Sequence, residues 1–319
     1  MKKILVLGGT GFVGRHVCEK LTRLSYRVTV PTRRRENAKL VQHLPRLDVL
    51  EADIHDPVAL AKLVAGHDAV INLVAILHGD EAAFERAHVA LPASLARACV
   101  QTGVKRVVHV SALGAALDAP SMYQRSKARG EAVLQAVGLD LTILRPSVIF
   151  GSDDKFLNMF ASLQKVFPVM PLAGGATRFQ PVWVEDVAQA IVNSVSYNVQ
   201  TVPAIAEACG PDVFTLKELV QLAARYAGIN HGQGRPVLAL PIALGRVQAA
   251  LMRLLPGEPM LSRDNLDSMQ VDNIASGKRP GLAALHVTPT PLAAIAPLYL
   301  GKQSTAAHLL VLRKTSGRF

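Results

Sequence analysis

The sequence predicts an α/β fold in which a doubly wound parallel sheet is followed by a small, mostly helical C-terminal lobe. In the first half, short apolar runs rich in β-branched residues alternate with stretches of helical length. These runs show no polar alternation, and strands of that kind are buried on both faces, as in parallel sheets covered by helices. Beyond residue 151 prolines become frequent and the alternation loosens, which indicates a separate lobe.

The first half contains six predicted strands and five predicted helices. Asp56 and Asp80 are typical helix starts, and Gly103 and Gly138 are typical helix ends. The helices are expected at roughly 12–24, 36–43, 57–65, 82–102 and 122–137. The strands are expected at Ile4–Leu7, Arg27–Val30, Asp48–Leu50, Ala69–Leu73, Arg106–Val110 and Leu141–Leu144.

The domain organisation follows from this change of pattern. Residues 1–150 are expected to form the first domain, residues 151–301 the smaller lobe, and residues 302–319 a basic tail. We expect the substrate between the two units, and some segments of the lobe can rejoin the first sheet. In the lobe, helices are expected near 156–165, 186–196, 215–228 and 241–255, with short strands at Pro203–Ala206 and Pro236–Leu240.

Composition excludes several classes of protein. The chain has 319 residues, of which half are hydrophobic and 18% are charged, which is typical of a globular protein. Cys18, Cys99 and Cys209 lie far apart, so neither a disulfide framework nor a zinc site is predicted, and the chain reads as a reduced, cytoplasmic protein. Two stretches without charged residues, 187–206 and 281–301, contain too many polar residues or prolines to be membrane spans.

The net charge of +11 is concentrated at the two ends of the chain. Residues 1–36 hold nine Lys and Arg against two Glu, residues 302–319 hold four and no acid, and the rest is balanced. A basic amino-terminal end suits a phosphate-bearing cofactor, and a basic tail suits an anionic surface. Nucleic-acid binding is not favoured, because no binding motif or aromatic-interleaved basic stretch accompanies the charge.

A glycine-rich turn joins the first predicted strand to the first predicted helix. Glycines there allow a tight turn and let the backbone approach a pyrophosphate at the helix N-terminus. The pattern alone can be a simple turn, but here it follows a strand and opens a helix, which is the context that binding requires. The sequence therefore predicts a Rossmann-type dinucleotide site formed by Gly8, Thr10, Gly11, Phe12, Val13 and Gly14.

The end of the second strand indicates which dinucleotide binds. An acidic residue there would accept the ribose hydroxyls of NAD(H), but this chain carries Arg33 and Arg34 instead. Guanidinium groups suit a 2′-phosphate, so NADP(H) is preferred over NAD(H), although a solvated charge run at a helix start would look the same. Asp53 and Ile54, where the adenine would lie, and Val74 after the fourth strand complete the predicted contacts.

A tyrosine and a lysine four residues apart form the candidate catalytic pair. Tyr123 and Lys127 lie on one face of a predicted helix, twelve residues beyond Ser111 at the end of the fifth strand. A nearby ammonium favours the phenolate, so we expect a lowered pKa for Tyr123 and a role as general acid or base. Ser111 could bind a substrate carbonyl oxygen. The alternatives are an exposed helix face for the pair and a plain strand-end hydroxyl for the serine.

Taken together, these motifs resemble the short-chain dehydrogenase/reductase superfamily. The resemblance is closest to an atypical, NAD-dependent epimerase/dehydratase-like branch related to the nucleotide-binding accessory subunit of respiratory complex I. It runs from residue 3 to about residue 300. The segments that carry it are the glycines at 8, 11 and 14, Arg33, Asp53-Ile54, His109–Ala112, Tyr123 with Lys127, Leu144–Gly151, Asp154–Asn158 and Gln180–Val187.

The resemblance implies a tightly held NADP(H), with Pro146 to Val148 lining the nicotinamide side. It does not imply turnover, because the mitochondrial relative is regarded as a structural subunit. Sugar-nucleotide epimerases of the superfamily usually place the serine much farther before the tyrosine, so a nucleotide-sugar substrate is not favoured. The first strand begins at once without a transit peptide, and we expect a bacterial cytoplasmic protein.

Two functions remain open. In the first, the protein is an oxidoreductase that uses NADPH to reduce a carbonyl or quinone-like substrate, with Tyr123 as proton donor, Lys127 on the ribose and Ser111 orienting the substrate. In the second, it is a non-catalytic NADPH-binding or assembly subunit of a respiratory or other membrane-associated complex, peripheral at the inner face of the membrane. The basic tail and an amphipathic helix at 241–255 favour the second, although packing within the lobe is the preferred interpretation of that helix.

Overall fold

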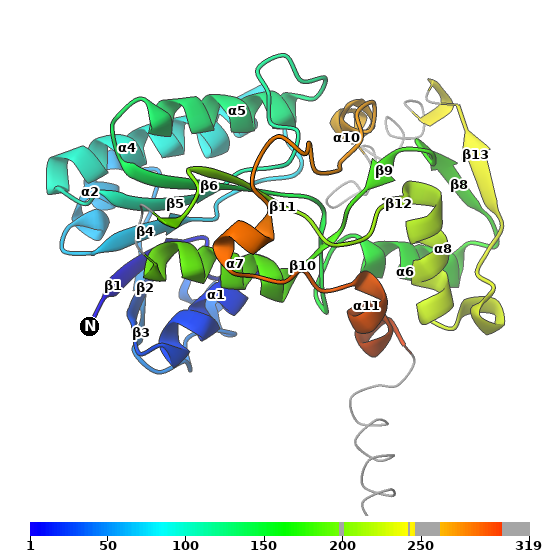
Figure 1. The fold of residues 1–319 in the computed structure, drawn as a ribbon, viewed down its shortest axis with the longest axis horizontal. Helices are drawn as coiled ribbons and strands as arrows, with labels where there is room; N and C mark the ends of the chain where they lie inside the picture. The colour runs from blue at the N-terminus through cyan, green and yellow to red at the C-terminus, as the bar shows by residue number, and fades with distance from the viewer. Residues whose placement is uncertain (198–200, 242, 246–261, 302–319) are drawn as a thin grey trace, which may run out of the picture.

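A computed structural model describes residues 1–197, 201–241, 243–245 and 262–301. Its centre is a sheet of seven strands, in the order β11-β6-β5-β4-β1-β2-β3, and every neighbouring pair is parallel (Figure 1). All six predicted strands are confirmed, and β11 is a seventh. The strands are β1 (Lys3–Leu7), β2 (Arg27–Thr32), β3 (Leu47–Glu51), β4 (Ala69–Asn72), β5 (Arg106–Val110), β6 (Asp140–Pro146) and β11 (Ile205–Ala208).

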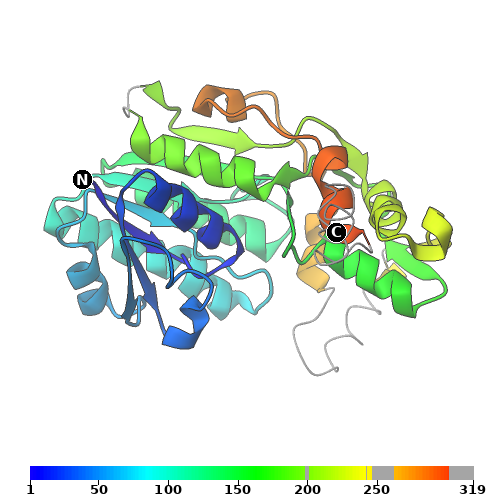
Figure 2. The same cartoon turned by 90° about the horizontal axis from the view of Figure 1, so that it is seen from below.

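Helices cover both faces of this sheet, which confirms the doubly wound fold. One face carries α1 (Phe12–Arg23) and α7 (Val184–Ser196), which pack side by side (Figure 2). The other face carries α2 (Pro57–Val64), α4 (Leu91–Thr102) and α5 (Met122–Gln135) (Figure 1). Each layer buries its own apolar core against the strands, which excludes water from both faces.

The strand order decides where a ligand can bind. From β1 the chain adds β2 and β3 on one side and then crosses to add β4, β5 and β6 on the other. The connections after β1 and β4 therefore diverge, which leaves a crevice at the carboxyl ends of these strands. All seven strands of this sheet are parallel, so the loops that follow their carboxyl ends lie at the same edge of the sheet.

Most predicted helix boundaries are confirmed by their caps. Asp56 accepts a hydrogen bond from the backbone N–H of Val58 at 2.9 Å, and Asp80 accepts one from Ala83 at 2.8 Å. Gly103 ends α4 in the left-handed region, at φ 74°. In contrast, α5 ends at Gln135, before the predicted end at Gly138.

The predicted helix at 36–43 is wrong in type. A single 3₁₀ turn, η1 (Arg35–Ala38), is followed by further turns in which Val41 N–H bonds to the Ala38 carbonyl and Leu44 N–H to the Val41 carbonyl. Ala38, Val41 and Leu44 all pack into the core beneath α1. Their spacing of three residues matches a 3₁₀ path, which keeps them on one side, better than the 3.6-residue period of an α-helix.

The predicted helix at 82–102 is present but contains a wider turn. It runs as α3 (Glu81–Glu85), a π-helical turn over Arg86–Ala90, and then α4. Pro92 has no amide hydrogen, so it cannot donate the usual helical bond to the carbonyl of His88. Such turns occur often at functional sites.

In the described part of the lobe, α6, α8 and α11 pack with several short strands around a second core, and Figure 1 shows these elements. The segment 151–301 also supplies strand β11 to the first sheet and helix α7 to one of its faces, and the division at residue 150 stays a prediction.

The predicted helix 241–255 lies largely outside the described residues, and the tail 302–319 lies wholly outside them. Among the described helices, none combines the length and apolar character needed to cross a membrane. The lobe elements are β7 (Ile149–Phe150), α6 (Leu157–Val166), β8 (Met170–Ala173), β9 (Arg178–Phe179), β10 (Val182–Trp183), β12 (Phe214–Thr215), α8 (Leu216–Tyr226), β13 (Val237–Leu240), α10 (Arg263–Ser268) and α11 (Leu292–Leu300).

Candidate functional site

The structure brings the predicted site residues to one edge of the sheet. Each follows the carboxyl end of a central strand or, for the Tyr/Lys pair, lies on the helix after β5. Convergence on this edge is what a dinucleotide site of a parallel sheet requires. The residues are Gly8 to Gly14 after β1, Arg33 and Arg34 after β2, Asp53 and Ile54 after β3, Val74 after β4, Ser111 after β5, Tyr123 and Lys127 on α5, and Pro146 and Val148 at the end of β6.

The glycine turn between β1 and α1 is closely packed against itself. Gly8 has φ 82°, a conformation that side chains disfavour. A Cβ atom on Gly14 would lie 2.3 Å from the carbonyl oxygen of Gly8, so any larger residue would push the helix off the turn. In contrast, Gly11 is exposed and a Cβ there would meet the Gly8 oxygen at 3.2 Å. The turn is thus closed on its inner side and open at the start of α1, where backbone N–H groups can receive a phosphate.

The residues that would surround the adenosine half are accessible. Arg33 and Arg34 are exposed immediately after β2. Asp53 is exposed in the turn after β3, where its side chain accepts a hydrogen bond from the backbone N–H of His55 at 2.9 Å. A small hollow of about 230 Å³, lined in part by Asp53, His55 and Arg86, lies beside this turn.

Lys127 is the most unusual charged group of the site. Its side chain is 1% exposed, and Nζ donates a hydrogen bond to the Val110 carbonyl at 2.7 Å. No carboxylate among the described residues lies within ion-pair distance of it. Burial lowers the pKa of Lys127 to about 8, and Glu131 one turn later opposes this shift. A buried ammonium held mainly by one carbonyl is costly, which favours a function for it.

The predicted lowering of the Tyr123 pKa is wrong. Burial raises the pKa of Tyr123 to about 12, because the phenolate would be desolvated between aromatic rings. The ring stands edge-to-face with His88, with centroids 5.5 Å apart, and with Phe84 at 6.1 Å. Tyr123 therefore keeps its proton at neutral pH. A protonated phenol can donate to a substrate oxygen but cannot serve as a base.

His88 packs against Tyr123, although none of the motifs found in the sequence includes it. Its Nε2 accepts a hydrogen bond from the Ile76 backbone N–H at 3.1 Å, which leaves the ring proton on Nδ1. Nδ1 lies 2.8 Å from the hydroxyl of Ser126, which in turn donates to the Tyr123 carbonyl at 2.8 Å. Burial and then Lys127 lower the pKa of His88 to about 3, so the ring is neutral. It links the loop after β4 to the helix of the Tyr/Lys pair.

The close approach of α5 to the π-helical turn that contains His88 holds this histidine against α5. A Cβ atom on Gly130 of α5 would lie 1.9 Å from the His88 carbonyl oxygen, so only glycine fits at this crossing. That carbonyl belongs to the π-helical turn before Pro92. The signal in the sequence was therefore a proline four residues after a histidine, together with a glycine inside the next helix.

Two buried polar atoms near Lys127 find no hydrogen-bond partner among the described residues. They are the hydroxyl oxygen of Ser111, which is 4% exposed, and Nε2 of His109, whose Nδ1 lies 3.2 Å from the Asn72 amide. Burial, and then Lys127 and His88, lower the pKa of His109. An unsatisfied buried hydroxyl costs free energy, so the Ser111 hydroxyl fits a role in receiving a ligand oxygen.

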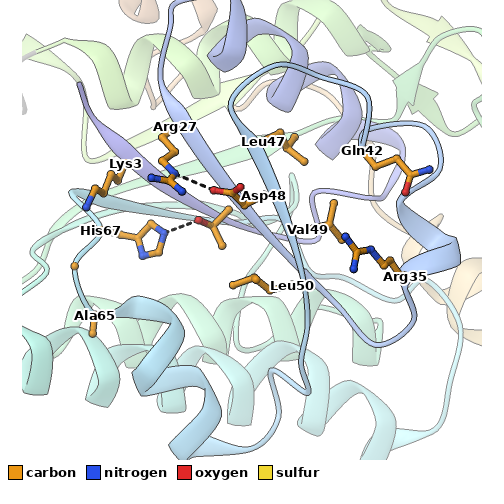
Figure 3. A pocket seen from close by; sticks show the side chains of 12 residues that line it. Lys3, Arg27, Arg35, Gln42, Leu47, Asp48, Val49, Leu50, Ala65 and His67 are labelled. Carbon is orange, nitrogen blue, oxygen red and sulfur yellow. Dashed lines mark hydrogen bonds and ion pairs between the residues drawn. The ribbon is translucent and has the colours of Figure 1, made fainter.

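A larger hollow, of about 650 Å³, follows the edge strand β3 (Figure 3). Its lining includes Lys3 and Arg27, which begin β1 and β2, and His67, which contacts the Thr29 hydroxyl at 2.9 Å. In Figure 3, Arg27 also reaches Asp48, at 2.9 Å. Residues at the amino ends of strands lie opposite the edge that carries the glycine turn. The lining also includes Leu50 and Arg35, near the carboxyl ends of β3 and β2, so the hollow runs along the edge strand from one edge of the sheet towards the other.

Known proteins resemble this chain over most of its length. It is 35% identical over 298 residues to NADH dehydrogenase (ubiquinone) 1 alpha subcomplex subunit 9, a mitochondrial protein of Mus musculus, covering 90% of this chain and 76% of the relative. It is 29% identical over 191 residues to a ceramide reductase of Caulobacter vibrioides, covering 59% of each protein.

Solved structures support the same fold. A dTDP-glucose 4,6-dehydratase from Streptomyces venezuelae, solved with NAD bound, superposes with a TM-score of 0.71 at 23% identity, covering 93% of this chain and 95% of the other. Residues 4–202, well over half of the chain, match the family model for NAD dependent epimerases and dehydratases. Together with the fold and the glycine turn, this match shows that the chain belongs to the NAD dependent epimerase/dehydratase family.

Proposed function

We propose that the protein binds NADP(H) at the carboxyl edge of the sheet and reduces a carbonyl or quinone-like substrate. The observation that carries the proposal is Lys127, a buried ammonium bonded to the carbonyl of Val110. The next residue, Ser111, has a buried hydroxyl without a hydrogen-bond partner among the described residues. When bound, NADPH supplies a hydride. Lys127 would hold the cofactor ribose, and Ser111 would orient the substrate oxygen. Tyr123, which burial keeps protonated, would donate the proton to that oxygen.

The glycine turn and the arginines after β2 fit this cofactor. The open side of Gly11 leaves the first backbone N–H groups of α1 accessible to a pyrophosphate. Arg33 and Arg34 are exposed, and a guanidinium matches the 2′-phosphate that distinguishes NADP(H) from NAD(H). The relative named a ceramide reductase supports reduction as the direction of the reaction.

The test is a fluorescence titration of the purified protein with NADPH and NADH, for wild type, Arg33→Ala and Arg23→Ala. We expect Arg33→Ala to weaken NADPH binding by about 10- to 100-fold, the value of a charge-assisted contact, and to leave NADH binding unchanged. Arg23 is an exposed arginine at the end of α1 and controls for net charge. Equal affinity for both dinucleotides in all three proteins would refute the NADP(H) preference.

Turnover is tested separately. Wild type should oxidise NADPH slowly with a short-chain quinone or an aldehyde, and Tyr123→Phe should abolish this oxidation with little change in NADPH affinity. A Tyr123→Phe variant that is as fast as wild type would remove the tyrosine from the mechanism.

A second candidate function is that of a non-catalytic subunit or assembly factor of a respiratory complex. The mitochondrial relative, a subunit of NADH dehydrogenase, favours it. In this case NADPH would bind tightly and never be consumed, and the protein would comigrate with NADH dehydrogenase activity on native gels of membranes from its source. Migration apart from that activity would count against this candidate.

A further inference from the structure

A segment far along the chain contacts the helix that carries Tyr123. The two carboxylate oxygens of Asp264, on α10, accept hydrogen bonds from the backbone N–H groups of Met122 at 2.6 Å and Tyr123 at 3.1 Å. Asp264 is 7% exposed. The backbone of the candidate proton donor is therefore held by a buried side chain from the lobe.

These contacts complete the cap of α5. The first N–H groups of a helix have no partner within the helix. The hydroxyl of Ser121 accepts the bond from Gln124, and Asp264 accepts the bonds from Met122 and Tyr123. A carboxylate is also attracted to the positive end of the helix dipole. The first turn, which bears Tyr123, is thus held to α10 by two charge-assisted bonds.

The same segment contacts the opposite wall of the site a few residues later. The side-chain oxygen of Asn273 lies 2.6 Å from the Ser147 hydroxyl and 3.3 Å from the Val148 N–H, both of which donate to it. The backbone of Asn273 bonds to β9 through Arg178 and to Gln180. Val148 belongs to the stretch expected to line the nicotinamide.

We propose that two residues of the segment 262–276, which we call the strap, set the geometry of the active site from both sides, and that the other side chains of the strap do not. Asp264 is a positioning residue for Tyr123, and Asn273 is a positioning residue for the wall at Ser147 and Val148. Neither touches the reacting atoms. The roles given to Tyr123 and Val148 rest on the proposed function, while the contacts of the strap do not. The strap ties the lobe to α5, so a substrate bound against the lobe would act on the proton donor through these bonds.

The first arm of the test compares Asp264→Asn with Asp272→Asn. Asp272 lies in the same strap and also accepts a backbone N–H, at 2.8 Å, but from Arg178 on β9 and not from α5. Asp264→Asn replaces one acceptor by an amide donor that faces an N–H group. We expect it to lower the rate of NADPH oxidation at saturating NADPH about tenfold, with the NADPH dissociation constant within twofold of wild type. Asp272→Asn should change neither.

The second arm uses the acceptor at Asn273. Asn273→Ala removes the acceptor of both hydrogen bonds. It should raise the NADPH dissociation constant about fivefold and leave the saturated rate within twofold. Asn273→Asp keeps an oxygen for the Ser147 hydroxyl and the Val148 N–H, and should restore binding to near the wild-type value. Loss of rate from one variant and loss of affinity from the other would distinguish positioning from general destabilisation.

The NMR resonance of Tyr123 can be measured without turnover, so it tests the role of the strap independently of the proposed function. In protein labelled with ¹³C at the tyrosine ring carbons, Tyr123→Phe identifies the Tyr123 resonance. A resonance displaced in Asp264→Asn but not in Asp272→Asn supports the strap, even if wild type never oxidises NADPH and the reductase proposal fails. A resonance that is unchanged in Asp264→Asn, or displaced equally in both variants, overturns the role of Asp264. An Asn273→Asp variant no better than Asn273→Ala overturns that of Asn273.

Discussion

Lys127→Met is expected to yield a protein that is more stable than wild type and no longer binds the dinucleotide. The pKa of Lys127 falls from 10.5 to about 8 on folding, and a tenfold change in an acid constant corresponds to about 1.4 kcal/mol. The buried charge therefore costs about 3 kcal/mol of folding free energy at pH 7, and replacing Lys127 by Met removes this cost. The same replacement also removes the hydrogen bond to Val110, which lowers the stability by about 1 kcal/mol. We expect the free energy of unfolding to rise by about 2 kcal/mol, with an NADPH affinity at least about 100-fold lower.

The pH dependence of this difference has a definite sign. The pKa of Lys127 is lower in the folded chain, so between pH 8 and 10.5 the unfolded chain binds more protons and wild type gains stability as the pH rises. The advantage of Lys127→Met should be complete below pH 8 and vanish towards pH 10.5. Denaturant unfolding at pH 7 and pH 10 measures it.

Lys62→Met is the matched control. Lys62 is an exposed lysine on α2, and its replacement should change stability by less than about 0.5 kcal/mol without affecting NADPH binding. A Lys127→Met variant that is less stable than wild type and still binds NADPH would make Lys127 a structural residue. Proteins keep such destabilising groups where function requires them, so the opposite result would support its place in the cofactor site.

Local patterns were sufficient to predict the sheet and the edge at which the candidate site residues lie. Apolar runs, aspartate caps and the glycine turn depend on neighbouring residues, and these predictions are confirmed. The segment 36–43 was assigned as a helix from its length between two strands, and eight residues of consecutive turns fill the same interval as a short helix.

The parts of the site that could not be predicted depend on burial or on distant contacts. A spacing of four shows that Tyr123 and Lys127 share a helix face, but it does not show that desolvation outweighs their mutual charge effect. The bonds from Asp264 to α5 span 142 and 141 residues, and those from Asn273 to Ser147 and Val148 span 126 and 125. No periodicity within a single segment reports such contacts.

Glu131→Gln is expected to destabilise the fold by about 3 kcal/mol or more, because it breaks a buried ion pair on one side only. Glu131 is 3% exposed and accepts two bonds from Arg145, at 2.9 Å from Nε and 2.5 Å from Nη2, which join α5 to β6. Glu131 is the main cause of the raised pKa of Arg145. Glu85→Gln breaks an exposed pair between Glu85 of α3 and Arg129 of α5, and should cost less than about 1 kcal/mol.

The same substitution should also shift the pH range of cofactor binding. Glu131 raises the pKa of Lys127 against the effect of burial, so its loss lowers that pKa further below about 8. In the proposed function NADPH binding needs the ammonium, so binding should then weaken at a lower pH than in wild type. Replacing the pair together, as Glu131→Leu with Arg145→Met, should restore most of the stability, because no unpaired charge is left, but should not restore the proton on Lys127. If titrations between pH 6 and 9 showed binding recovered along with stability, the ion pair would only hold α5 on the sheet. Recovery of stability alone would show that Glu131 also maintains the charge of Lys127.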